Sequence, residues 1–163
     1  MVEREQTETR GRMRWEDGAV YGLALAGIYL LVGVLFFYSG KGKIIDGHGA
    51  PPSIEKQFSG TFFATFPGID AIWTILGILE LLIAVLLVVS LIRLEFLPAR
   101  KKTFLLVGLA LSVFTFACLA TGQNVTGQND GVADLYVYAA GTVVLMLLVR
   151  LMPPYRPGRW ISD

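Results

Sequence analysis

The sequence predicts an all-α membrane protein: a four-transmembrane-helix bundle with a short surface helix in the first outer loop. Hydrophobic residues make up 54% of the 163 residues, a larger share than an ordinary soluble domain carries. Four separate apolar segments are each close to the roughly 20 residues that a helix needs to cross a hydrocarbon core of about 30 Å. The Lys and Arg residues lie between or outside these segments.

The composition excludes several classes of function. The net charge is +1, and no basic stripe marks a nucleic-acid surface. Cys118 and His48 are the single cysteine and the single histidine, so we expect no internal disulfide and no pair of histidines to bind a haem. The sequence contains neither a nucleophile motif nor a phosphate-binding glycine loop. It therefore predicts no catalytic residue, no metal site and no cofactor held by this chain alone.

The chain is expected to consist of a membrane domain between two tails. Residues 1–17 would form a cytoplasmic N-terminal tail, 18–150 the four-helix transmembrane domain and 151–163 a cytoplasmic C-terminal tail. The predicted spans are 18–39, 69–92, 103–121 and 132–149. The first is too long for a signal peptide and runs directly into Lys41 and Lys43, so we interpret it as a membrane helix.

The distribution of basic residues predicts the orientation, because short cytoplasmic segments of membrane proteins are enriched in Lys and Arg. Most Lys and Arg residues lie in the two tails and in the loop after the second span, and the first and third loops together hold only Lys41, Lys43 and Lys56. Both termini are therefore predicted to be cytoplasmic, in a multi-pass membrane protein. The basic residues on the predicted inner side are Arg4, Arg10, Arg12, Arg14, Arg93, Arg100, Lys101, Lys102, Arg150, Arg156 and Arg159.

The first outer loop contains the predicted surface helix, over residues 53–65. Ser53 is a suitable N-cap after two prolines, and Pro67 with Gly68 would end the helix. We expect its aromatic stripe to pack against the outer ends of the bundle, with a helix at the membrane surface or a lid over a site as alternatives. The stripe consists of Phe58, Phe62, Phe63 and Phe66.

Glu80 stands in the middle of an apolar run, 74–88. Charged residues such as Asp, Lys and Arg cost roughly 2.5 to 3.5 kcal/mol at the centre of a membrane helix. Counting about 1.5 Å per residue from the predicted helix ends places one polar group from each other helix at a similar depth. The sequence therefore predicts an intramembrane polar site made of Glu80, Tyr29, Ser112 and Thr142.

Small residues suggest which helix faces meet. Gly77 and Ala84 share the face of Glu80, and a similar small-residue stripe contains Tyr29, so we expect Tyr29 to donate a hydrogen bond to Glu80. Lys43, at the outer end of the first span, is expected to lie too far away for an ion pair. A protonated, hydrogen-bonded Glu80 is therefore predicted, and three roles stay open: setting helix register, binding a proton, ion or ligand, or contacting a partner subunit.

Further polar residues fall near the predicted outer ends of the spans. They form a candidate outer polar cluster of Lys43, Asp70, Gln123 and Asp134.

Two stretches resemble the DoxX-like family of four-helix membrane proteins. The first is "GVLFFYSGKGK", which begins at Gly33 and ends at Lys43, and the second is "GILELL", which contains Gly77 and Glu80. The resemblance covers about residues 18–150. It implies an inner-membrane protein of a bacterium or archaeon that is linked to redox enzymes, because the family is named for a subunit associated with a terminal quinol oxidase.

The expected function is that of an auxiliary or structural subunit of a quinone-linked respiratory complex. Its partners would be the lipid bilayer and other membrane subunits, which would hold any quinone, haem or flavin. One alternative is a small transporter or proton-coupled exporter that uses Glu80 and the outer polar cluster. A weaker alternative is a quinone-interacting oxidoreductase subunit in which Tyr29 and Glu80 bind the head group.

Overall fold

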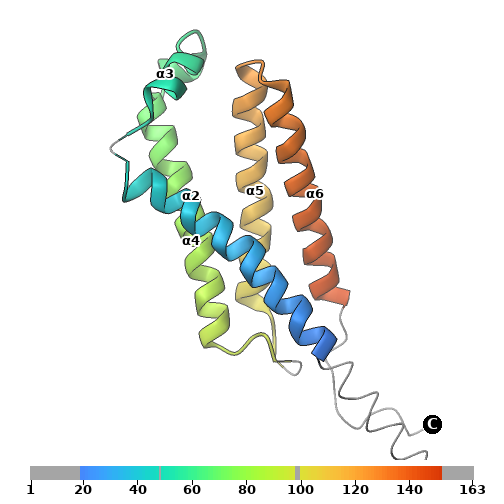
Figure 1. Cartoon of the computed structure of the whole chain (residues 1–163). Coiled ribbons are helices and arrows are strands. Elements are labelled where there is room, and N and C mark those ends of the chain that lie inside the picture. The colour runs from blue at the N-terminus through green and yellow to red at the C-terminus, as the bar shows by residue number, and fades with distance from the viewer. Residues whose placement is uncertain (1–18, 48, 98–99, 152–163) are drawn as a thin grey trace, which may run out of the picture.

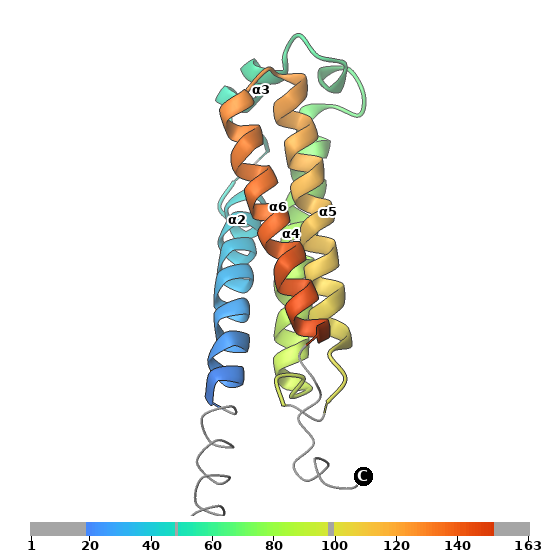
Figure 2. The same ribbon diagram turned by 90° about the vertical axis from the view of Figure 1, so that its right-hand side faces the viewer.

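The computed structural model describes residues 19–47, 49–97 and 100–151. Within these ranges all regular structure is helical. Four helices are long and apolar enough to cross a membrane: Ala19–Ile44, Ile69–Ile92, Thr103–Val125 and Asn129–Leu151. The last three of them, α4, α5 and α6, run alongside one another, and the first span crosses them obliquely (Figures 1 and 2). The predicted all-α, four-span fold is thus confirmed, while the predicted tails fall outside the described residues except for Leu151.

The first span is one long helix with a wider turn in its middle. Residues 19–28 are α-helical, η1 (Tyr29–Val34) is a π-helical turn, and α2 (Leu35–Ile44) completes the span beyond its predicted end at residue 39. Its buried residues Ile28, Val32, Phe36 and Gly40 recur every fourth position. Since an α-turn takes about 3.6 residues, such a stripe drifts around the helix, and the wider π-turn offsets this drift. One face therefore stays on the bundle.

The other three spans match their predicted cores and differ at their ends. Helix α4 (Ile69–Ile92) has the predicted bounds. Helices α5 (Thr103–Val125) and α6 (Asn129–Leu151) are each a few residues longer than predicted at the end where a turn joins them. The turn between them uses Gly127 in the left-handed region at φ 73°. Because this turn is so short, polar residues that the sequence assigns to a loop remain helical.

The helices pack in chain order. Helix α2 lies against α4, α4 against α5, and α5 against α6, as Figures 1 and 2 show. An aromatic row crosses three helices: the Phe36 and Phe116 rings are 5.1 Å apart, and the Phe116 and Tyr138 rings are 5.9 Å apart. The apolar core consists of Leu25, Ile28, Tyr29, Val32, Phe36, Ile83, Leu87, Leu105, Leu109, Phe116 and Val149.

The loop between α2 and α4 forms two short helices instead of the one expected over residues 53–65. Helix α3 (Pro52–Phe58) begins without a side-chain cap, and a 3₁₀ turn, η2 (Phe62–Ala64), follows it. The Ser59 and Thr61 hydroxyls bond the Lys56 and Phe58 carbonyls. Short polar side chains that bond nearby backbone in this way compete with helix continuation.

This break also divides the predicted aromatic stripe. Phe58 and Phe63 are half-buried, whereas Phe62 and Phe66 are 69% and 71% exposed within the monomer. The prediction that the whole stripe packs against the bundle is therefore wrong, because Phe62 and Phe66 are uncovered in the monomer.

Candidate functional site

Lys43 of α2 and Glu80 of α4 form a buried ion pair. We name it the outer ion pair, using outer and inner according to the orientation that the sequence predicts. The Lys43 Nζ lies 2.9 Å from Glu80 Oε1 and 2.7 Å from Oε2, and it also donates to Ser39 Oγ at 2.7 Å. An ammonium group has three protons, and these three contacts use all of them. The side chains of Lys43 and Glu80 are 10% and 1% exposed.

An aromatic ring completes the surroundings of the ammonium group. Lys43 Nζ lies 5.0 Å from the centre of the Trp73 ring, which α4 contributes two turns before Glu80. A cation within about 6 Å of an aromatic face is attracted by the ring quadrupole. Carboxylate, hydroxyl and ring thus surround one cation.

Two glycines bring α2 and α4 close enough for this pair. A Cβ placed on Gly40 would lie 2.9 Å from the Leu81 backbone nitrogen and 3.0 Å from the Gly77 carbonyl oxygen. A Cβ on Gly77 would lie 2.8 Å from Ile44 Cδ1 and 2.9 Å from Lys43 Cβ. Any larger residue at Gly40 would push backbone from backbone and move Lys43 away from α4.

The predicted hydrogen bond from Tyr29 to Glu80 is not formed, and that prediction is wrong. Tyr29 bonds Ser90 at 2.7 Å, and Ser90 lies ten residues beyond Glu80, or about 15 Å along α4. The expectation that Lys43 lies too far from Glu80 is also wrong, and with it the reason for predicting a protonated acid. Tyr29 and Glu80 would lie at the same depth only if the first span and α4 ended at one level. Instead, the end of α2 packs beside Gly77, eight residues inside α4. A head group held between Tyr29 and Glu80 loses its geometric basis.

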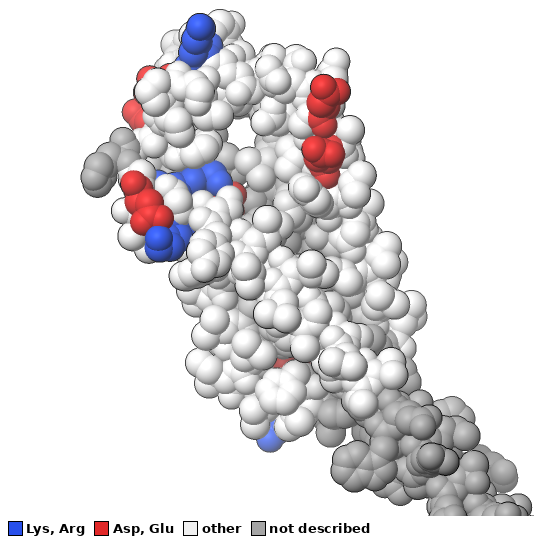
Figure 3. All heavy atoms as spheres, viewed as in Figure 1, with Lys and Arg blue, Asp and Glu red and all other residues white. Residues whose placement is uncertain are grey.

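The outer ion pair lies level with exposed charges. Gly77, which contacts the end of α2, is about 12 Å below the first residue of α4. At this end of α2, Lys41 and Asp46 form a second pair, with side chains 37% and 55% exposed. Figure 3 shows charged atoms gathered from this level upward, while the surface below is almost entirely white down to the lower end. Glu80 therefore lies at the outer margin of the charge-free band instead of its middle.

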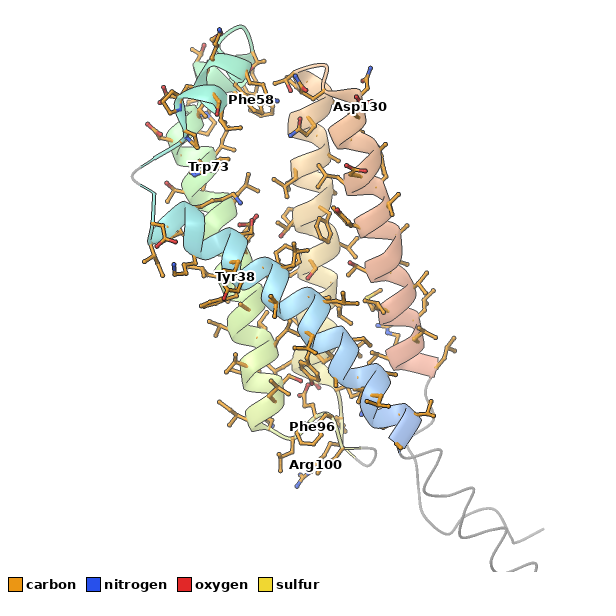
Figure 4. The ribbon with its side chains drawn as sticks, in the orientation of Figure 1. Tyr38, Phe58, Trp73, Phe96, Arg100 and Asp130 are labelled. Carbon is orange, nitrogen blue, oxygen red and sulfur yellow. The ribbon has the colours of Figure 1, made fainter. Side chains whose placement is uncertain are left out.

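The molecule is hollowed beside this pair (Figure 3), with blue and red atoms inside the hollow. Helix α3 crosses above it to α5: Gln57 Nε2 donates to Thr126 Oγ1 at 2.8 Å and to Gln123 Oε1 at 3.3 Å. Phe58 extends from α3 toward α5 (Figure 4), within 3.4 Å of where a Cβ on Gly122 would lie. We name this space the outer hollow.

A second buried acid, Glu95, lies at the opposite end of the core. Its carboxylate accepts hydrogen bonds from Ser90 Oγ at 2.8 Å and from the backbone N–H groups of Phe104 and Leu105 at 3.1 and 3.0 Å. Because Ser90 gives its only proton to Glu95, the Tyr29 hydroxyl must donate to Ser90. We name the series Tyr29, Ser90, Glu95 and the start of α5 the inner hydrogen-bond chain.

The end of α4 places Glu95 for these contacts. The Glu95 N–H bonds the Ser90 carbonyl at 3.0 Å, and the Leu94 N–H bonds the Leu91 carbonyl at 2.9 Å, which is the pattern of a Schellman motif. Leu94 occupies the left-handed position of this motif at φ 56°, where glycine is usual. The turn directs the carboxylate to the N-terminus of α5, where the helix dipole favours negative charge.

The remaining predicted site residues are satisfied separately. Ser112 and Thr142 are buried, but each hydroxyl donates to a carbonyl of its own helix, that of Gly108 and that of Tyr138, both at 2.8 Å. They do not join Glu80 in one polar layer. A serine or threonine hydroxyl in an apolar helix often bonds the preceding turn in this way.

The predicted outer polar cluster is likewise divided. Asp70 Oδ1 accepts from the Ala50 N–H at 2.7 Å, Gln123 accepts from Gln57 above the outer hollow, and Asp134 is exposed on α6. Only Lys43 reaches Glu80 directly.

Every buried polar side-chain atom in the described ranges has a hydrogen-bond partner. The same ranges contain no group of three or more His, Cys, Asp or Glu side chains placed to hold a metal ion. No match was found when the chain was compared with models of protein families, with curated proteins and with solved structures. The interpretation of the site therefore rests on its own residues.

Proposed function

We propose that this chain is an auxiliary subunit of a larger, quinone-linked redox complex in the cytoplasmic membrane of a bacterium or archaeon. Quinone, haem or flavin would be held by partner chains. The redox assignment is supported by the resemblance to DoxX-like proteins on Gly33, Gly40, Lys43, Gly77 and Glu80. The subunit role is supported by the uneven burial of the four membrane helices in the monomer.

The uneven burial of the four spans carries the subunit role. In the monomer only 17% of the apolar window of α6 is buried, compared with 39% for α5. The buried polar side-chain groups, by contrast, all have hydrogen-bond partners within the described part of the chain. A long helix whose apolar surface is mostly uncovered in the monomer offers that surface to lipid or to another subunit.

The test is purification from the native membrane in a mild detergent through a tag after Asp163. We expect the chain to elute in fixed ratio with haem- or flavin-containing subunits, identified by mass spectrometry and by the absorption spectrum. Elution alone, together with substrate uptake in reconstituted vesicles, would favour the transporter alternative and overturn the proposal.

Two matched variants locate the contact. Val144 on α6 and Val85 on α4 are 54% and 55% exposed, so replacement by Trp adds the same bulk to a comparable apolar surface. Val144→Trp should release the partner chains while Val85→Trp retains them, with the melting temperature of the isolated subunit unchanged in both. Equal retention by both variants would argue against α6 as the contact.

The same tagged protein tests the orientation. We propose that both termini face the cytoplasm, supported by the basic residues of the inner segments. A reporter fused after Asp163 should then be active in the cytoplasm and one inserted beside Gly127 should be active outside. Identical responses from the two positions would contradict this topology.

A further inference from the structure

The surroundings of the Lys43 ammonium group have the composition of a cation-binding site. Glu80 supplies two carboxylate oxygens, Ser39 a hydroxyl oxygen, and Trp73 an aromatic face. Charge-assisted hydrogen bonds and an aromatic ring together recognise alkylammonium groups in proteins. Here the occupant is a side chain of the same protein.

Lys43 is attached to this site by a flexible stem at the end of a helix. It belongs to the last turn of α2, which ends at Ile44, and its four-carbon stem has several rotatable bonds. Its ammonium group is held by Glu80, Ser39 and Trp73 alone. A second ammonium group that offered the same charge and donors would compete for the same atoms.

The outer hollow gives such a competitor a path to the site. It lies beneath the contacts that Gln57 of α3 makes with Gln123 and Thr126. Charged atoms are visible inside it from the surface (Figure 3).

We propose that Glu80, Trp73 and Ser39 form a binding site for a primary organic ammonium ligand, which enters through the outer hollow and displaces Lys43. Lys43 is then the resident competitor that keeps the site filled when ligand is absent. This inference goes beyond the proposed function, because a subunit with or without redox partners would bind such a ligand equally.

Butylammonium chloride is the probe, titrated calorimetrically into the full chain in detergent micelles near neutral pH. Butanol and sodium butyrate are matched probes with the same chain and no positive charge. The wild-type protein should show saturable binding of butylammonium only. In Lys43→Met the affinity should rise about a hundredfold or more, because removing an occupant that is held in a buried ion pair restores the fraction of open sites. The Lys43→Met/Glu80→Gln double variant should not bind, and Lys41→Met should behave as wild type.

Each other outcome overturns the proposal. Binding by Lys43→Met but not by wild type would make Lys43 a permanent part of the structure, and equal binding of butanol would make the hollow a general apolar space. Should Lys43→Met fail to fold, the wild-type titration decides alone: no saturable heat with butylammonium rejects the site.

Discussion

Glu80 and Glu95 are buried carboxylates at opposite ends of one apolar core, and their donors differ. Glu80 is paired with a single side-chain cation, the Lys43 ammonium group, which also contacts a hydroxyl and an aromatic ring. Glu95 is held by two backbone N–H groups at the start of α5 and by the Ser90 hydroxyl. The first arrangement joins two helices through charge, and the second joins three segments through neutral donors.

This difference has a physical consequence. Removing the one cation leaves Glu80 as an unpaired buried charge, whereas the donors of Glu95 are distributed, so that no single side-chain substitution removes them all. Replacing the acid should cost less stability at Glu80 than at Glu95. The Lys43 ammonium group is on a stem with several rotatable bonds and can reorient, whereas the backbone N–H groups at the start of α5 are fixed. The outer ion pair should therefore be sensitive to the loss of its partner and the inner hydrogen-bond chain to the loss of its acid.

The largest expected effect is that of Lys43→Met. Breaking a buried ion pair by removing one partner costs about 3 to 5 kcal/mol, and we expect the free energy of unfolding, measured by SDS titration in mixed micelles, to fall by this amount. Lys41→Met removes a largely exposed partner and should cost at most about 1 kcal/mol. The Lys43→Met/Glu80→Met double variant should recover most of the loss. Equal losses from the two lysine variants would contradict the ion-pair assignment.

The sequence predicted the fold well because length and hydropathy decide it. The ends of α4 follow from Gly68 before the apolar run and Arg93 after it. The sequence also singled out Glu80, since an acid in such a run demands a partner. What it could not supply was the partner, because the level of the first span relative to α4 depends on the close approach of Gly40 and Gly77.

The role of Glu95 could not be predicted from the sequence for a related reason. It lies in a segment of basic and apolar residues after α4, nine and ten positions before the backbone groups that it accepts from. A lone acid shortly before a predicted helix start is a signal for an N-terminal contact. The distance along the chain conceals it, since sequence rules for caps apply to residues within one turn of the helix end.

The second effect is that of Glu95→Leu, which leaves the N–H groups of Phe104 and Leu105 without their acceptor. An unsatisfied buried donor costs about 1 to 3 kcal/mol, so the variant should be destabilised by at least this range. Glu95→Gln retains one carbonyl oxygen and should lose less. Amide hydrogen exchange at Phe104 and Leu105 should accelerate in the leucine variant. Identical stability of the Gln and Leu variants would remove the acceptor role.

A smaller effect is expected for Tyr29→Phe, which removes the first donor of the inner hydrogen-bond chain. Ser90 keeps its bond to Glu95, so the loss should be that of one hydrogen bond, about 1 kcal/mol. Tyr38→Phe is the matched control, because Tyr38 belongs to the same span and its side chain is exposed in the monomer. Indistinguishable unfolding midpoints for the two variants would show that Tyr29 contributes packing only.

The smallest effect should come from Ser112→Ala, although Ser112 is fully buried at the core. Its hydroxyl donates to the Gly108 carbonyl, one turn earlier in α5, and this oxygen lies in a helix whose own N–H groups bond the same row of carbonyls. Removing the hydroxyl therefore removes a polar group together with its need for a partner, and such bonds to the preceding turn add little to helix stability. We expect a change below about 1 kcal/mol in the free energy of unfolding. A loss as large as that of Lys43→Met would mean that Ser112 bonds another helix, and it would restore the single polar layer that the sequence first suggested.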